Sequence, residues 1–155
     1  VGDMSRSRVV ARAERRVLEG GWIVAAGRGR AMKVCHDMHE SDRSATGFLP
    51  KEELERTADA FLANPWFGVR GWETAASAQD RICSAVRRVA SELPDRDLLF
   101  VGHGAVGTLL YCDLAGQPIS RVFDQFGGGG KFLAFDPDQW TVERGWAPME
   151  ALTLR

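Results

Sequence analysis

The alternation of apolar and polar residues is clearest in the second half of the chain. Leu98–Val101 is a continuous apolar run with turn-forming residues on each side, a pattern typical of a strand buried on both faces of a sheet. Apolar residues then recur near the helical spacing over Ala105–Ala115. Because Gly116 and Pro118 are residues that end helices, the sequence predicts a strand, a tight turn and a helix in this order.

Similar patterns elsewhere predict further strands and helices. We expect strands at Arg8–Ala11 and Ala31–Cys35, helices at Ala13–Ala26, Lys51–Ala63 and Trp72–Leu93, and an edge hairpin from Lys131–Phe135 and Gln139–Arg144. On the helix over Trp72–Leu93, Arg81, Arg87 and Arg88 are expected to face mostly outward. The β-α-β order at the start favours parallel strands with a right-handed crossover. We therefore expect an α/β fold, a mainly parallel sheet between two helical layers, as one domain over residues 1–155.

Composition narrows the classes of function. The formal net charge of −1 over 155 residues gives no general attraction to nucleic acid or anionic lipid. No apolar run approaches the roughly 18 residues that a membrane span needs, and no signal-peptide pattern is present. Three widely spaced cysteines without a C-x-x-C pair favour reduced thiols, which predicts a cytoplasmic protein.

His103 occupies the most suggestive position in the sequence. It lies between the carboxyl end of a predicted strand and the amino end of a predicted helix, where ligands bind in open α/β sheets. Free N–H groups and the helix dipole favour an anion there, and glycines at Gly102 and Gly104 let a ligand approach the backbone. The pattern indicates a phosphate group held against His103.

Two other interpretations of this motif remain open. The first is a buried turn with an incidental histidine. The second is dinucleotide binding, because Gly102, Gly104 and Gly107 form G-x-G-x-x-G after a strand and Asp124 lies at about the distance expected for a ribose contact. However, only about thirty residues follow Asp124, with a glycine run and no second predicted helix.

The polar stretch from His36 to Pro50 contains two His, two Asp and one Glu. Such a cluster raises the question of a metal, but the spacing of His36 and His39 matches no H-E-x-x-H or cysteine-pair pattern. A loop at the carboxyl end of a strand more often supplies one or two functional side chains. We expect no metal here.

The order of these segments resembles the histidine phosphatase superfamily, also called the phosphoglycerate mutase-like family. VGHGAVGTLLYCDLAG is similar to its second histidine motif, and GWETAASAQDRICSAVRRV, with Glu73 and Arg81, to its preceding Gly-Glu-Ser helix. VVARAERR resembles the segment with a phosphate-binding arginine, and Met38-His39-Glu40 the segment with the acid. The resemblance covers about residues 8–146 and, through the DRSATGFLP loop, is strongest to a short-chain bacterial branch.

The resemblance implies a role for each matching residue. His103 would donate to phosphoryl oxygens, Arg16 would clamp the phosphate, and Glu40 would protonate the leaving group of a small phosphomonoester, with no cofactor. Arg12 stands where the family usually has Ser, and the neighbouring Arg15 is an alternative to Arg16. Further residues expected to contact substrate or set specificity are Gly102, Gly104, Arg43, Ser44, Thr46, Lys51, Trp66 and Phe67.

The sequence departs from the family at its amino end. The family's first strand, which would lie beside Leu98–Val101, ends in an Arg-His-Gly motif whose His attacks phosphorus, and no such motif occurs in this sequence. Either the sequence is a fragment or the domain has lost its nucleophile. We expect a phosphatase-like protein that is inactive for want of this His; the alternatives are a non-catalytic phospholigand-binding module and a dinucleotide-binding domain. Five Trp and an unpaired edge near the missing strand are compatible with a homodimer and leave the oligomeric state open.

Overall fold

The computed structural model describes residues 8–11, 32–94, 98–127 and 130–151. Its first sheet is parallel, with the order β2-β1-β3, and joins β1 (Arg8–Ala11), β2 (Met32–Val34) and β3 (Leu98–Val101). Val9 of the central strand pairs with Met32 on one side and with Leu99 on the other. The parallel sheet is therefore confirmed, whereas the helix expected at Ala13–Ala26 lies outside the described residues.

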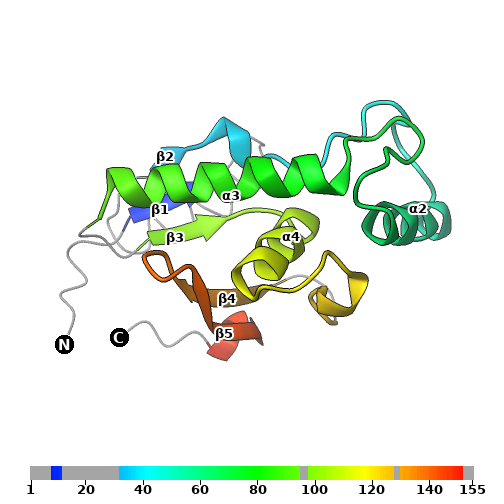
Figure 1. Cartoon of the computed structure of the whole chain (residues 1–155). Coiled ribbons are helices and arrows are strands. Elements are labelled where there is room, and N and C mark those ends of the chain that lie inside the picture. Colours follow the sequence, from blue (N-terminus) through cyan, green and yellow to red (C-terminus); the bar gives the residue numbers. More distant parts are fainter. Residues whose placement is uncertain (1–7, 12–31, 95–97, 128–129, 152–155) are drawn as a thin grey trace.

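Helix α3 (Ala75–Glu92) lies across this sheet and supplies much of the core (Figure 1). Its buried stripe follows the helical repeat and consists of Ala75, Ala76, Ala78, Ile82, Cys83, Ala85, Val86 and Val89. The helix begins later than Trp72, the residue expected from the apolar pattern, because Thr74 caps it: the Thr74 hydroxyl accepts from the Ser77 N–H at 3.1 Å. Trp72 is buried before the helix, and its indole N–H donates to the Thr46 hydroxyl at 2.8 Å.

Helix α4 (Gly104–Leu114) follows β3 directly, which confirms the predicted strand–turn–helix. Its buried residues include Val106, Leu109, Leu110 and Leu114. The helix ends at Leu114, and Gly116 follows the C-cap Ala115 with a φ of +61°, which is favourable for glycine. The N–H groups of Gln117 and Gly116 donate to the carbonyls of Cys112 and Asp113, and this paired arrangement stops the helix.

The hairpin predicted near the carboxyl end is present, as β4 (Lys131–Asp136) and β5 (Thr141–Pro148). It was expected at the edge of the parallel sheet, but within the described residues it forms a separate two-stranded antiparallel sheet. It lies on the side of β3 opposite to β1 (Figure 1). A cavity of about 530 Å³ separates β3 from β4, and Phe100 and Phe135 stack at its wall with ring centroids 6.2 Å apart.

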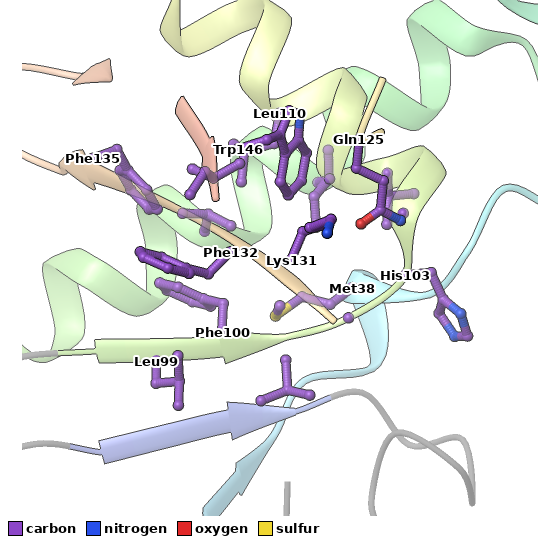
Figure 2. Close-up of a pocket in the computed structure, with 18 of the residues that line it drawn as sticks. Met38, Leu99, Phe100, His103, Leu110, Gln125, Lys131, Phe132, Phe135 and Trp146 are labelled. Carbon is purple, nitrogen blue, oxygen red and sulfur yellow. The ribbon is translucent and has the colours of Figure 1, made fainter. Parts of the chain in front are cut away.

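This cavity corrects one expectation about β3. The apolar run Leu98–Val101 predicted a strand buried on both faces, yet all four residues are only half-buried. The physical reason is that all four residues line the cavity between β3 and β4, which leaves part of their surface uncovered. Pairing with β1 covers only the other edge of the strand. Figure 2 shows Leu99 and Phe100 on β3 beside this cavity, with Phe132 across it.

The remaining elements surround this core. Helix α2 (Lys51–Ala63) has the limits that the sequence predicts and buries Thr57, Phe61 and Leu62. Short 3-10 helices occur at η2 (His36–Met38), η3 (Arg121–Phe123) and η4 (Met149–Ala151). Cys35, Cys83 and Cys112 are buried free cysteines, and a buried free cysteine packs as a small apolar residue. Among the described residues, no helix is long and apolar enough to cross a membrane.

Candidate functional site

His103 stands at the junction between β3 and α4, as the sequence predicts. It is the N-cap residue of α4, with extended backbone (φ −101°, ψ 157°), and its carbonyl accepts from the Gly107 N–H at 3.1 Å. The imidazole is 28% exposed and extends away from the apolar lining of the cavity (Figure 2). The side chain is therefore partly exposed beside the N–H groups of the first helical turn, where an anion is favoured.

Glu40 lies next to this histidine. Its Oε2 is 4.0 Å from His103 Nδ1, and its side chain is only 14% exposed. The other carboxylate oxygen, Oε1, accepts from the Ser41 N–H at 3.1 Å. Two residues that the sequence assigned to one site, from segments far apart along the chain, are thus brought together. A carboxyl group and an imidazole at this separation can hold and pass a proton to a group bound between them.

Glu40 follows β2 and η2, and helix α3 holds this segment through Arg81. The Arg81 guanidinium donates from Nη1 to the carbonyls of Asp37 (2.9 Å) and His39 (2.8 Å). Arg81 was expected to face mostly outward, but its side chain is only 17% exposed. The spacing contained the signal, because Arg81 lies three residues after Ala78 and four before Ala85, on the buried face of α3.

Glu73 completes this arrangement. Its two carboxylate oxygens accept from Arg81 Nε (3.2 Å) and Nη2 (2.7 Å), the paired geometry that a guanidinium favours. Burial acts to raise the pKa of Glu73, but the hydrogen bonds from Arg81 and from the Asp42 N–H outweigh it, so that this pKa lies below its ordinary value. Glu73 is therefore a carboxylate at neutral pH, and Arg81 is held by a full opposite charge.

The two glycines beside His103 have different surroundings. A side-chain Cβ added at Gly102 would meet no atom of the described residues within 4 Å, so these residues leave room for a ligand against the backbone. At Gly104 an added Cβ would lie 2.2 Å from Gln125 Nε2, so that the Gln125 side chain already makes the close approach that glycine permits. Gln125 was not among the residues predicted for the site, and nothing in its local sequence indicated it.

The structure describes only some of the cationic residues predicted for the site. Arg12, Arg15 and Arg16 lie outside the described residues. Arg43 lies over the ring of Trp72, with its guanidinium carbon 5.6 Å from the ring centroid, and this contact helps to order the loop after Glu40. Of the other candidate specificity residues, Trp66 and Phe67 are exposed. The structure therefore assembles the His103–Glu40 part of the predicted site.

Asp124, the residue considered for a ribose contact, has partners within the chain. Its Oδ1 accepts from the Thr108 hydroxyl (2.7 Å) and from the Gln125 N–H (2.8 Å), and Oδ2 pairs with Arg121 Nε at 3.2 Å. Thr108 is fully buried on α4. The Asp124 carboxylate therefore links the segment after α4 to the helix that begins at the site.

Comparison with known proteins identifies relatives for the sequence and the fold. The family model of the histidine phosphatase superfamily (branch 1) matches residues 4–146. A solved mycobacterial glucosyl-3-phosphoglycerate phosphatase, complexed with VO3, has a TM-score of 0.66 at 20% identity, covering 90% of this chain and 73% of that one. Bacillus stearothermophilus YhfR has a TM-score of 0.69 at 19% identity, with 90% and 71% covered.

The mycobacterial glucosyl-3-phosphoglycerate phosphatase has also been solved with inorganic phosphate; that structure has a TM-score of 0.65 at 16% identity and covers 91% of this chain and 73% of that one. No curated protein matches the sequence. At these identities the solved structures establish the α/β fold.

Proposed function

Since the chain belongs to the histidine phosphatase superfamily, we propose that it is a phosphatase-like protein whose pocket receives the phosphoryl group of a small phosphomonoester. The observation that supports this most directly is the pair formed by His103 and Glu40, 4.0 Å apart at the amino end of α4. A phosphoryl oxygen beside His103 would meet a hydrogen-bond donor and the positive end of a helix dipole. The Glu40 carboxyl is close enough to serve the same ligand.

Each residue has a proposed role. His103 donates to the phosphoryl oxygens and stabilises their charge, while Glu40, as a general acid, protonates the oxygen of the leaving group. Arg16 is proposed to clamp the phosphate through its planar guanidinium, with Arg12, Arg15 and Arg43 as further cations for the substrate. This chemistry uses no cofactor, and the ligand is a small phosphorylated molecule.

The proposed phosphoryl transfer also requires a nucleophile. The 155 residues contain three His and no Arg-His-Gly motif. His36 is exposed on η2, and His39 directly precedes Glu40 in the segment that carries the proposed acid, so we assign the nucleophile to neither. The family resemblance places such a nucleophilic His at the end of a strand beside β3. Without that strand, the chain is expected to bind phosphoryl groups with little or no turnover.

The test is a thermal-shift titration with orthovanadate, which resembles a phosphoryl group in transfer. Two solved structures of one neighbour, the mycobacterial phosphatase with VO3 and with inorganic phosphate, support the choice of ligand. We expect stabilisation of the unmodified chain, none of His103→Ala, and unchanged stabilisation of His36→Ala, which removes an exposed imidazole outside the site. Absence of stabilisation in the unmodified chain, or its persistence in His103→Ala, would overturn the proposal. Stabilisation by NAD in place of vanadate would favour a dinucleotide site instead.

A further inference from the structure

We propose that Arg81 is a positioning residue that holds the segment Asp37–Asp42, called here the acid loop, so that the Glu40 carboxyl faces His103. This inference rests on the proposed function, because it assigns a partner to the proposed acid. Arg81 itself lies on α3, and its hydrogen bonds go to the acid loop and to Glu73. It would therefore act on the ligand through Glu40.

The contacts of Arg81 are with the backbone of the acid loop. Its Nη1 donates to the carbonyls of Asp37 and His39 at 2.9 and 2.8 Å, and its Nη2 lies 3.5 Å from the Glu40 carbonyl. These carbonyls lie on both sides of the end of η2, where the chain leaves regular structure. One rigid, planar group with five donors can bind several such acceptors at fixed angles, which the single ammonium of lysine cannot reproduce.

Glu73 fixes the guanidinium and the far end of the acid loop together. It accepts two hydrogen bonds from Arg81, and its Oε2 also accepts from the Asp42 N–H at 3.2 Å. In return, the Glu73 N–H donates to the Asp42 carbonyl at 3.0 Å. Arg81 thus holds the start of the acid loop and Glu73 its end, and Glu40 lies between these two points.

The burial of the Arg81–Glu73 ion pair indicates that the pair positions the acid loop and does not only stabilise the fold. The side chains of Arg81 and Glu73 are 17% and 15% exposed. Removing two charges from water costs free energy that their attraction often does no more than recover. What the pair provides is an acid loop held at two points, with Glu40 Oε2 4.0 Å from His103 Nδ1.

Arg88 provides a matched control on the same helix. It lies two turns after Arg81, and its Nη2 donates to the Asp37 carboxylate at 2.7 Å. This pair is half exposed, at 50% and 53%, and its hydrogen bonds reach no backbone carbonyl of the acid loop. Exposed ion pairs contribute little to stability. Arg88→Lys therefore makes the same chemical change on α3 without releasing the acid loop.

The experiment measures the dissociation constant of orthovanadate, whose oxygens can accept a hydrogen bond from the Glu40 carboxyl. We expect Glu40→Ala and Arg81→Lys each to weaken binding by roughly fivefold, the value of one hydrogen bond. Arg88→Lys should stay within about twofold of the unmodified chain. In the double variant, Arg81→Lys should add nothing to Glu40→Ala, because the group that it positions is already absent.

Amide hydrogen exchange of the same proteins separates a loosened loop from a damaged fold. In Arg81→Lys we expect faster exchange across Asp37–Asp42 and unchanged exchange in α3, and in Arg88→Lys no change in either. Equal exchange of the acid loop in Arg81→Lys and the unmodified chain would overturn the inference whether or not vanadate binds. Additive losses in the double variant would overturn it as well. Failure of the unmodified chain to bind vanadate instead overturns the proposed function.

Discussion

The Oε2 atom of Glu40 lies 4.0 Å from Nδ1 of His103. The two side chains come from segments that lie far apart in the sequence. His103 caps α4 at the end of β3, while Glu40 follows β2 and η2. Folding therefore places a carboxyl group and an imidazole around one point at the amino end of a helix. We propose that His103 would bind a phosphoryl group at this point and that Glu40 would protonate its leaving group.

The first prediction concerns turnover. When the chain is mixed with p-nitrophenyl phosphate, we expect no burst of p-nitrophenol and a steady rate no greater than that of His103→Ala, because the sequence has no Arg-His-Gly motif to supply a nucleophile. Rapid-mixing absorbance measures both quantities. A burst equal to the protein concentration that disappears in His103→Ala would contradict this prediction, since it would require a nucleophile within the 155 residues.

The second prediction concerns the core beneath the site. Leu109 is fully buried on α4, so Leu109→Ala removes apolar contacts and leaves a cavity. We expect the free energy of unfolding to fall by about 3 kcal/mol, measured by urea denaturation. Val122→Ala is the control: Val122 is 84% exposed, and its truncation should change the free energy by less than about 0.5 kcal/mol. Equal effects of the two truncations would argue against the packing described for α4.

The third prediction concerns acid stability. The pKa of Glu73 is lowered from its ordinary 4.5 because the hydrogen bonds from Arg81 and Asp42 outweigh the opposing effect of burial. A carboxyl group whose pKa is lower in the folded than in the unfolded state stabilises the fold above the ordinary value, and this contribution is lost as the pH falls below it. Glu73→Gln should therefore be less stable than the unmodified chain near neutral pH.

Urea denaturation at a series of pH values checks this prediction. The difference between the unmodified chain and Glu73→Gln should shrink as the pH falls below 4.5, the ordinary value from which the pKa of Glu73 is lowered. Glu143 is a suitable control, because it is exposed on β5. Glu143→Gln should run parallel to the unmodified chain across the same range. A difference for Glu73→Gln that stays constant with pH would show that the carboxylate charge is not what stabilises the acid loop.

Local signals explain what the sequence predicted well. The run Leu98–Val101, the turn after it and the stop at Gly116 each depend on a few neighbouring residues, and the strand and helix follow them closely. The limits of α2 were likewise predicted from Pro50 and Asn64, which flank the helix. The position of His103 follows from these elements alone.

Long-range packing explains what the sequence did not predict. The burial of β3 on both faces was wrong, because a cavity opens along the edge of β3 away from β1. Arg81 was expected to face mostly outward, although it shares a face with Ala78. The carbonyls to which it donates belong to a distant segment that no local pattern connects to α3. The position of Glu40 followed from the family resemblance, since the local sequence of a polar loop does not determine which residue it brings to a distant histidine.

The last prediction concerns the start of α3, the helix that carries Arg81. Thr74 is its N-cap, and its hydroxyl accepts from the Ser77 N–H at 3.1 Å, which satisfies one of the helix's unpaired donors. Thr74→Ala removes this acceptor and should lower the free energy of unfolding by about 1 kcal/mol, whereas Thr74→Ser keeps the oxygen and should recover most of the loss. Because Glu73 directly precedes the cap, fraying of this turn should also speed amide exchange at Asp42, whose N–H donates to Glu73. Loss of stability without faster exchange at Asp42 would separate the capping of α3 from the ordering of the acid loop.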